Sequence, residues 1–572
     1  MSASRFEKDA SAGSETSPDN GASVRAHADA SGSGQGTIDV PASDKPQAVE
    51  FHKDIRFWAI FIALGFAGLL TALEATITST ALPSIINDLN GAEQYIWANN
   101  GYFLAMTSLQ PLYGQLSNVF GRRWPTILAT AAFTLGSGIC GGANSIGMLI
   151  AGRTVQGIGA GGINVLIEII VCDLVPLRQR GQYLAMMFGL VALGTALGPF
   201  FGGLIVQYST WRWVFYLNIP VGGVALLLLI LFLNVKYKKQ PTFARSLSRI
   251  DWIGNIVFIA SISAILIALS WAGAIYPWNS SWVLVPLILG ILGLAGFLIL
   301  EKFVAEPMIP LRLLSNRTSL IAYILTFLHS IVTMWALYFL PIYFQGVKRY
   351  SSGYAGVALL PTILILIPTA AAGGSIMSKT GRYRPIHHIG YALITVGFGL
   401  FTLLNEGSST GKWVGFQIVN SAGAGLIIPT LLPAVLASLT DADTALATAT
   451  WAFLRSFGLT WGTAIPAAIF NNRVEEIADC IVDPSVRHDV TGGRAYEHAV
   501  RVYVNALHPE TRSQFIGVLV DGLRRTWQVS IALSALGFLL VVLQKEVPLR
   551  EELDTEFGMK DKKQTPDAEA VG

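Results

Sequence analysis

The sequence predicts an all-α protein that crosses a membrane many times. Only 13% of the 572 residues are charged, whereas 52% are hydrophobic; roughly a quarter of a typical soluble chain is charged. Apolar runs recur along most of the chain, and each is about as long as the 18 or more residues that a helix needs to cross a bilayer. The chain is therefore expected to be a polytopic membrane protein.

The composition also excludes several function classes. A net charge of +3 is too small to suggest a nucleic-acid partner. No GxxxxGK[ST] phosphate-binding motif is present, and "GSSTGK" at 407–412 has one residue too few between its glycines, which argues against ATP as the energy source. The eight histidines show no metal-ligand spacing, and the three cysteines form no disulfide framework. We expect no metal and no cofactor.

Both ends of the chain differ from the apolar middle. Residues 1–50 are rich in Ser, Ala, Gly and Asp and are expected to form a disordered cytoplasmic tail. Since no apolar run lies near Met1, no cleaved signal peptide is expected. Residues 548–572 are predicted to be a second, charged cytoplasmic tail.

Fourteen transmembrane helices are predicted between these tails. Their expected ranges are 57–82, 96–117, 126–143, 147–172, 181–207, 213–235, 252–271, 281–303, 319–344, 354–378, 386–404, 413–437, 445–470 and 526–545.

Lys and Arg set the orientation, because short cytoplasmic loops carry an excess of both. One alternating set of loops holds fifteen: Arg122, Arg123, Arg178, Arg180, Lys236, Lys238, Lys239, Arg245, Arg249, Lys302, Arg312, Arg317, Lys379, Arg382 and Arg384. The opposite short loops hold four, namely Arg212, Lys348, Arg349 and Lys412. The first set and both termini are therefore predicted to be cytoplasmic.

An internal repeat divides the chain. "GQLSNVFGRR" (114–123) and "GSIMSKTGRY" (374–383) each have Gly, a second Gly seven positions later, and then Arg. We expect a six-helix bundle over 51–240, two additional transmembrane helices over 241–305, and a second six-helix bundle over 306–547 with an outside loop at 471–525. Parallel repeats of this kind mark transporters with a site near the membrane midplane. The alternative is that Gly-Arg turns are simply common in such loops.

Four motifs occur in order and in register with the predicted helices. They are "LEATITSTALP" (73–83), "GQLSNVFGRR", "RTVQGIGAGG" (153–162) and "GTALGPFFGG" (194–203). With "WRWVFYLNIPVG" (211–222) and "LREELDTEFG" (549–558), the chain resembles the major facilitator superfamily over roughly residues 55–560. It most resembles the fourteen-span drug:proton antiporters, in their fungal multidrug and toxin-efflux branch.

The resemblance implies a major facilitator fold, with two six-helix halves plus two extra central spans. It implies a transporter rather than an enzyme. This transporter would export drugs or a secondary-metabolite toxin by proton antiport with alternating access. Its partners would be protons, an amphipathic small molecule and the lipid bilayer. A monomer in the plasma membrane is expected, with the vacuolar membrane as the alternative. Other functions left open are vacuolar transport of basic amino acids, siderophore transport, and a non-transporting receptor.

The loop motif departs from the family pattern. The resemblance implies conformational roles for Gly114, Asn118, Gly121, Arg122 and Arg123. The family has an Asp where this chain has Asn118, and that Asp resembles half of a charge-relay pair. Since Asn forms no salt bridge, the alternative is that Arg122 or Arg123 pairs with Asp173.

The fifth predicted span carries a ridge of small residues. Gly194, Gly198 and Gly202 recur every four residues, so they share one helix face, and Pro199 can bend the helix. We expect a pliable contact between the two halves, with ordinary close helix packing as the alternative.

Two predicted spans carry charged groups at matching depth. Glu74 lies among threonines in the first span, and Thr78 shares its face. The fourth span has a polar stripe formed by Arg153, Gln156, Gly157, Asn164 and Glu168. At a rise of 1.5 Å per residue, Glu74 and Arg153 differ by about 6 Å in depth. We hypothesise that the two interact.

Glu74 is the first choice for the proton-coupling carboxylate, with Arg153 tuning it, and Glu168 is the second choice. A carboxylate balanced between costly burial and a cationic neighbour can change protonation as access alternates. The alternative is a permanent structural ion pair.

Other intramembrane polar or aromatic groups are candidates for the substrate cavity. They are Thr78, Gln110, Gln156, Asn164, His329, Trp335, Asn420, Trp451 and Arg455. Hydrogen-bonded bystanders and packed or interfacial aromatic residues are the alternatives.

The predicted topology can be tested by glycosylation. Asn279 begins an "NSS" sequon in a predicted outside loop, whereas Asn316 begins an "NRT" sequon predicted to face the cytoplasm. On expression in yeast, we expect an endoglycosidase-sensitive gel shift that Asn279→Gln removes and Asn316→Gln leaves in place. A shift that depends on Asn316 would invert the orientation.

Overall fold

The structure is a computed structural model that describes residues 54–552, except 90–94, 236–242 and 274. The predicted disordered tail at 1–50 and most of the predicted tail at 548–572 lie outside the described residues. The described chain is built from helices without a β-sheet. The predicted all-α class is therefore confirmed.

The helices fall into a first set, a linking set and a last set. The first set is α1 (Ile55–Leu89), α2 (Tyr95–Ser108), α3 (Gln110–Phe120), α4 (Arg123–Gly141), α5 (Ile146–Leu174), α6 (Leu177–Tyr208), α7 (Arg212–Tyr216) and α8 (Asn218–Phe232). The linking set is α9 (Phe243–Leu247), α10 (Trp252–Trp271) and α11 (Ser281–Leu300). The last set is α12 (Arg312–Ser315), α13 (Arg317–Ile342), the π-helix η1 (Tyr343–Val347), α14 (Ser352–Ala358), α15 (Leu360–Thr380), α16 (Arg384–Phe401), α17 (Thr410–Leu436), the 3₁₀-helix η2 (Asp441–Asp443), α18 (Thr444–Ile477), the 3₁₀-helix η3 (Ala478–Cys480), α19 (Pro484–Val490), α20 (Ala495–His498), α21 (Arg501–Ala506) and α22 (Pro509–Leu543). We call the first and last sets the N half and the C half.

Every predicted span coincides with helical structure. By length and composition, 10 candidate spans among the described residues can cross a membrane. The other predicted spans correspond to α2 with α3, α4, α16 and α18, which are helical but do not satisfy both the length and the hydropathy expected of a span. The number of fourteen spans stays a prediction.

The predicted outside location of 471–525 stays a prediction, and helices occupy both ends of this segment. Helix α18 continues to Ile477, and α22 already begins at Pro509. The Arg473 and Asp521 side chains form a 2.7 Å ion pair between these extensions. The 35 residues of α22 span about 52 Å, longer than the roughly 30 Å hydrocarbon core. Both helices therefore continue past the length that a bilayer requires, and polar side chains that pair with each other stabilise these extensions.

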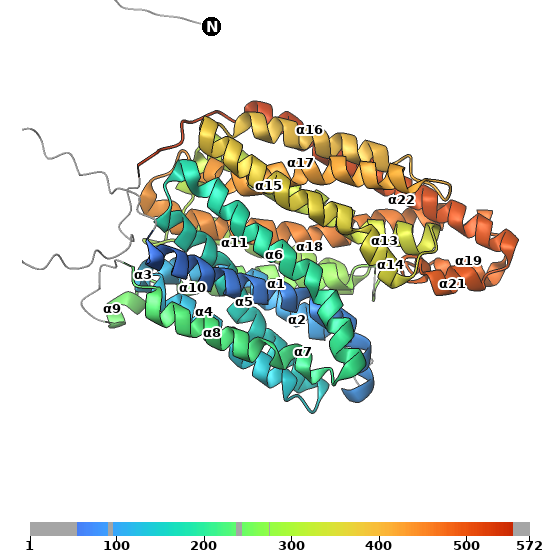
Figure 1. The fold of residues 1–572 in the computed structure, drawn as a ribbon, viewed down its shortest axis with the longest axis horizontal. Helices are drawn as coiled ribbons and strands as arrows, with labels where there is room; N and C mark the ends of the chain where they lie inside the picture. Colours follow the sequence, from blue (N-terminus) through green and yellow to red (C-terminus); the bar gives the residue numbers. More distant parts are fainter. Residues whose placement is uncertain (1–53, 90–94, 236–242, 274, 553–572) are drawn as a thin grey trace, which may run out of the picture. The chain divides into compact units, whose positions relative to one another are not determined.

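The two halves repeat one packing pattern. In the N half, α1 packs on α6 and α8, α4 packs on α5 and α8, and α2 packs on α5. In the C half, α13 packs on α18 and α22, α16 packs on α17 and α22, and α15 packs on α17. Each contact has a counterpart eight predicted spans later, and Figure 1 shows the two bundles side by side. This is the arrangement expected for a parallel internal repeat.

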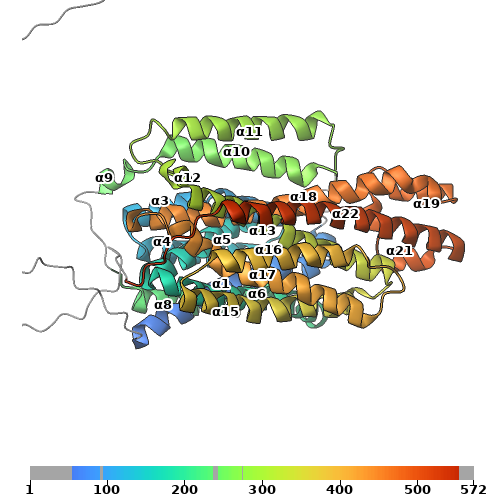
Figure 2. The same ribbon diagram turned by 90° about the horizontal axis from the view of Figure 1, so that it is seen from above.

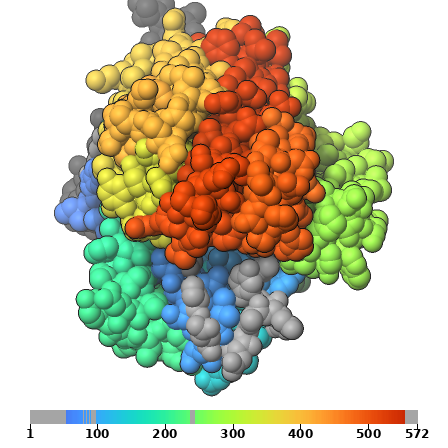
Figure 3. All heavy atoms as spheres, turned by 90° about the vertical axis from the view of Figure 1, so that its right-hand side faces the viewer, coloured from blue at the N-terminus to red at the C-terminus, as the bar shows by residue number. Residues whose placement is uncertain are grey.

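The described chain begins and ends at the same end of the bundle, which we call the tail end (left in Figure 1). The Lys and Arg distribution predicts that the tail end is cytoplasmic. Figure 3 views the opposite end, where the line between the N half and the C half is recessed.

Helices α10 and α11 lie together along one side of the bundle, as Figure 2 shows. Side chains at the tail end tie this pair to the N half. Asn255 Nδ2 donates to Gln115 Oε1 at 3.0 Å, and Gln115 Nε2 donates to the Glu306 carbonyl at 3.1 Å. Gln115 belongs to the loop motif, so the motif also anchors the linking helices.

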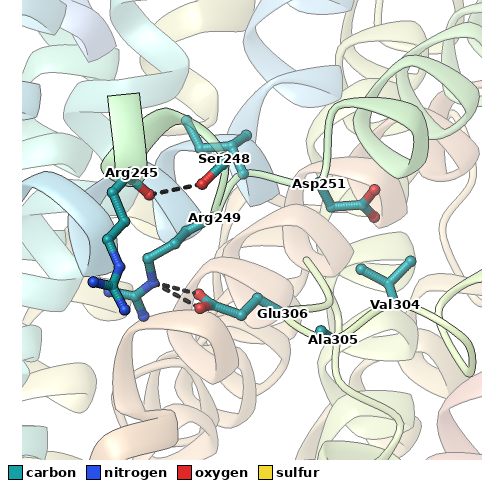
Figure 4. A pocket seen from close by; sticks show the side chains of 8 residues that line it. Arg245, Ser248, Arg249, Asp251, Val304, Ala305 and Glu306 are labelled. Atoms are coloured by element: carbon teal, nitrogen blue, oxygen red, sulfur yellow. Dashed lines mark hydrogen bonds and ion pairs between the residues drawn. The ribbon is translucent and has the colours of Figure 1, made fainter. Parts of the chain in front are cut away.

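An open pocket of about 720 Å³ lies beside this anchor. Its lining residues are Arg245, Ser248, Arg249, Ile250, Asp251, Val304, Ala305 and Glu306, and Figure 4 shows that Arg249 points toward Glu306. Their side chains form a 2.7 Å ion pair. Nearby, Glu301 is buried and accepts the backbone N–H groups of Met308 (3.3 Å) and Ile309 (3.2 Å).

Glu301 makes the stability of this region depend on pH. Burial, with the Asp251 carboxylate adding to it, raises the pKa of Glu301 from 4.5 to about 7. The folded protein therefore holds a proton that the unfolded chain loses near pH 4.5, and this stabilisation disappears as the pH rises through about 7. We expect Glu301→Gln to raise stability at pH 8 by about 1–2 kcal/mol, allowing for partial solvent screening, and to leave it unchanged at pH 4.5.

Thermal unfolding of the detergent-solubilised protein measures this difference. Glu306→Gln is the matched control, because it removes an exposed ion pair and should give no gain at pH 8. Equal effects of Glu301→Gln at both pH values would contradict the assignment.

Candidate functional site

Glu74 lies at the centre of a fully buried polar network. Its Oε1 accepts hydrogen bonds from Arg153 Nη1 at 2.5 Å and from Thr78 Oγ1 at 3.0 Å. Its Oε2 accepts from Asn218 Nδ2 at 2.5 Å. The side chains of Glu74 and Arg153 are both 0% exposed. The hypothesised contact between the two charges is therefore present.

Arg153 is held from several sides as well. Its Nε donates to the Ala98 carbonyl at 3.0 Å, and Nη1 also donates to Gln156 Oε1 at 2.7 Å. Its guanidinium lies over the Tyr102 ring, 4.3 Å from the ring centre. Gln156 Nε2 in turn donates to Ser137 Oγ at 2.8 Å. All of these groups belong to the N half, so rocking one half against the other would carry the whole network along unbroken.

A second ion pair crosses between the halves. Arg455 Nη2 on α18 contacts Glu168 Oε1 on α5 at 2.5 Å, and their side chains are 19% and 3% exposed. The Arg455 guanidinium lies 4.8 Å from the Trp451 ring centre and 5.0 Å from that of Phe188. Glu168 Oε2 is buried and has no hydrogen-bond partner among the described residues. In contrast to Glu74, Glu168 therefore keeps one oxygen available for a proton.

Glycines bring the halves into close contact toward the tail end. A Cβ atom on Gly114 would lie 2.4 Å from the Ala449 Cβ, and one on Gly374 would lie 2.4 Å from the Gly181 carbonyl oxygen. Gly114 and Gly374 are the first glycines of the two repeat copies. The second glycines, Gly121 and the one at position 381, both have positive φ, at 78° and 68°. Both copies thus use glycine for close approach and then for a helix end with positive φ, which is left-handed helical at position 381.

Arg122 forms the pair that the departure from the family pattern suggested. Its Nε contacts the buried Asp173 Oδ2 at 2.7 Å, and its Nη1 donates to the Ser117 carbonyl at 2.8 Å and to Asn118 Oδ1 at 3.1 Å. Arg123 instead donates to the Ile230 carbonyl at 2.8 Å. Asn118 therefore supports the pair by a hydrogen bond and adds no charge.

The predicted ridge on α6 does not join the halves. A Cβ on Gly194 would lie 2.9 Å from the Leu69 carbonyl, while Cβ atoms on Gly198 and Gly202 would meet the side chains of Thr76 and Thr80. These partners lie on α1 of the same half, so the predicted contact between halves is wrong. Small residues allow α1 and α6 to pack closely within one half. Pro199 lies within α6 and is exposed.

Most candidates for the substrate cavity are buried in this conformation. Thr78, Gln110, Gln156, His329, Trp335, Asn420 and Trp451 are at most 5% exposed. Only Asn164 and Arg455 of this set keep partial exposure. Gln110 Nε2 donates to Ser456 Oγ across the halves at 3.0 Å, and His329 Nε2 lies 3.0 Å from the Ala424 carbonyl oxygen. Gln110 therefore contributes to the contact between the halves in this state.

Sequence reasoning missed Asn218 and Tyr102 as partners of the buried charges. Asn218 lies within the quoted segment "WRWVFYLNIPVG", so a polar residue in an apolar run was the available signal. For Tyr102, the sequence offered no signal, because its position over Arg153 depends on how α2 packs on α5.

Of the two sequons, Asn279 is exposed, while the Asn316 side chain accepts the Thr318 N–H at the start of α13.

Comparisons with known proteins agree with this architecture. A family model described as Major Facilitator Superfamily matches residues 64–463. The MFS-type transporter pydD of Acremonium sp is 55% identical over 93% of this chain and 94% of its own length. The MFS efflux transporter aclA of Aspergillus oryzae is 48% identical over 88% of this chain and 92% of its own. The crystal structure of the human organic anion transporter MFSD10 (TETRAN) covers 85% of this chain and 99% of its own, with a TM-score of 0.55 and 15% identity, so it shows the fold alone.

The Glu74–Arg153 network generates a stability prediction. Removing one member of a buried ion pair leaves the other charge uncompensated, which costs about 3–5 kcal/mol. We expect Glu74→Gln and Arg153→Gln each to lower the thermal unfolding midpoint strongly. The double variant Glu74→Gln/Arg153→Gln should recover part of the loss, because it leaves no lone charge.

Thermal unfolding of the unchanged protein, the two single variants and the double variant in detergent completes this double-mutant cycle. Thr78→Val is the control, because it removes one hydrogen bond to Glu74 and keeps both charges. An unchanged midpoint for Glu74→Gln would show that Glu74 tolerates neutralisation, as a titrating carrier must, and would contradict the permanent ion pair.

Proposed function

The chain belongs to the Major Facilitator Superfamily, in its fungal efflux branch, and on this premise we propose that it exports an amphipathic small molecule by proton antiport. It is a transporter and not an enzyme, in keeping with that family. It is an integral membrane protein, and we propose the plasma membrane as its location and the monomer as its working unit. The observation that carries the coupling mechanism is the Glu168–Arg455 ion pair, which joins the two halves.

The conformation described here is the one closed at the tail end. The halves meet through Gly114 against Ala449 and Gly181 against Gly374. Arg178 Nε adds a 2.9 Å hydrogen bond to the Ser378 carbonyl. Because the Lys and Arg distribution predicts a cytoplasmic tail end, we propose that this state opens outward. Alternating access then requires these contacts to separate.

Protonation of Glu168 lowers the free-energy cost of separating the halves. If the halves parted with Glu168 ionised, two partly buried charges would lose their partners, at a cost of about 3–5 kcal/mol. A proton that arrives from outside and binds the unpaired Oε2 neutralises the carboxylate and removes most of this cost. Once the tail end opens, the proton is released to the cytoplasm, and substrate then binds from the cytoplasm. Inward proton flow thereby drives outward substrate movement.

Glu74 has a different part in this scheme. Both of its oxygens accept hydrogen bonds, all from the N half, and neither it nor Arg153 is exposed. We propose that the pair keeps α1, α5 and α8 together as the N half moves. This reverses the order of preference from the sequence, because exposure and an unpaired oxygen favour Glu168.

Aromatic side chains beside Arg455 favour a ligand with a flat apolar part. Trp451 and Phe188 come from opposite halves, with ring centres 6.2 Å apart. Separation of the halves would open the space between them, and such rings can stack on flat molecules. Substrate binding and closure at the tail end would then compete for the same aromatic faces.

Transport assays distinguish the two carboxylates. In yeast lacking its own multidrug pumps, we expect the chain to export rhodamine 6G, and a protonophore to stop the export. Glu168→Gln should lower proton-driven export at least about tenfold, the effect of 1.4 kcal/mol. Arg455→Lys, which keeps the charge, is the matched control and should retain more activity than Arg455→Gln.

Glu74→Gln is assayed at equal surface expression and should keep its protonophore-sensitive export. Full proton-driven export by Glu168→Gln together with its loss in well-folded Glu74→Gln would return the coupling role to Glu74.

A further inference from the structure

The chain segment after α22 does not leave the protein at the end of the helix. Residues 544–551, which we call the strap, run across the tail end of the C half and reach the N half. The strap includes the first residues of the "LREELDTEFG" segment, for which the transport cycle proposed above has no use. Its Leu549 side chain is 6% exposed, so the strap is packed against the bundle.

The first part of the strap is fixed to the C half. Gln544 Oε1 lies 2.9 Å from His387 Nδ1 on α16. The Lys545 carbonyl accepts from Tyr383 Oη at 2.8 Å, and the Val547 N–H donates back to the same hydroxyl at 2.9 Å. The strap is therefore anchored at Gln544, Lys545 and Val547 before it reaches the boundary between the halves.

The last part of the strap bridges the halves. On the C half, Arg550 Nη1 pairs with Asp441 Oδ2 at 2.6 Å, and Nη2 donates to the Leu439 carbonyl at 3.0 Å. On the N half, the Arg178 backbone N–H donates to the Arg550 carbonyl at 3.1 Å, and the Arg178 side chain pairs with Glu551. Arg550 thus contacts both halves, and the neighbouring Glu551 contacts the N half.

Arg178 is the point where the strap meets the gate. It is the second residue of α6, and its side chain also donates to the carbonyls of Ser378 (2.9 Å) and Lys379 (2.8 Å) in the second repeat copy. If the tail end opens, Arg178 must move away from both carbonyls and from Arg550 and Glu551 together. The strap therefore adds to the contacts that keep this end closed.

We propose that the strap is a latch that stabilises the conformation closed at the tail end and must release Arg178 before that end opens. The latch rests on alternating access of the two halves, as proposed above, but on neither the proton site nor the substrate. Each exposed ion pair contributes modestly, about fivefold or less in a conformational equilibrium, and the two pairs act in series across the boundary.

Double electron–electron resonance, which measures distances between two spin labels, reports directly whether the tail end is closed or open. Trp124→Cys and Arg382→Cys place labels on exposed positions of opposite halves at the tail end. Cys480→Ser removes the exposed native cysteine, while the other two cysteines are buried. In nanodiscs, we expect one short main distance for the labelled protein. The double variant Arg550→Gln/Glu551→Gln should raise the ratio of long to short distances by up to about fivefold.

Lys545→Gln is the matched control, because it removes an exposed positive charge from the strap but keeps the backbone carbonyl that accepts from Tyr383. A chain ending at Glu552 keeps the whole strap and should also behave like the full chain, whereas one ending at Pro548 should behave like the double variant.

Identical distance distributions for the double variant and the Lys545→Gln control would overturn the latch. Thermal unfolding midpoints show whether each variant is folded, and the double variant keeps every anchor on Tyr383 and His387. The measurement uses no proton gradient and no substrate. Loss of the latch with intact proton coupling, or the reverse, would therefore separate this proposal from the proposed function.

Discussion

A charge buried in an apolar bundle must have a partner, and the arrangement of this protein depends on where each partner lies. An isolated ion in such surroundings costs several kcal/mol, so it is stable only when an opposite charge or several hydrogen bonds surround it. Glu74 has Arg153, Asp173 has Arg122, and Glu168 has Arg455. The first two pairs lie within the N half, and only the third crosses to the C half.

In the proposed transport cycle, this difference separates the parts that stay together from the parts that move. Pairs within one half hold α1, α4 and α5 in a fixed relation, and the glycine ridge of α6 packs that helix closely on α1. The pair across the halves is broken whenever the halves separate. Protonation is the least costly way to break it, because neutralising a carboxylate removes the charge without moving the backbone. In the proposed mechanism, energy coupling therefore follows from the location of one pair rather than from an unusual side chain.

Closure at the tail end is distributed over contacts of different strength. Glycines at equivalent positions of the two repeat copies allow helices of opposite halves to approach at backbone distance. Such contacts are close but contribute mainly dispersion energy, so they can separate and re-form. Arg178 adds hydrogen bonds to the second repeat copy and to the strap. The repeat therefore explains why the two sides of this closure resemble each other, while the strap belongs to the C half alone.

Much of the architecture could be predicted from the sequence, because lipid imposes strict requirements on it. Long apolar runs predicted the helices, the two Gly-Arg segments predicted the repeat, and the depth of Glu74 and Arg153 predicted their contact. Helix ends outside the apolar runs were predicted less well. Polar residues that pair with each other extend α18 past its predicted end at 470 and start α22 before its predicted start at 526.

Only the tertiary structure decided which helix faces meet. It placed the α6 ridge against α1, the Asn218 side chain on Glu74, and Arg455 against Glu168 from a helix 287 residues away. A helical pattern shows which residues share a face, but that face can meet any neighbour of suitable shape. The partner of each charge is set by packing among many helices, and that information is spread over the whole chain.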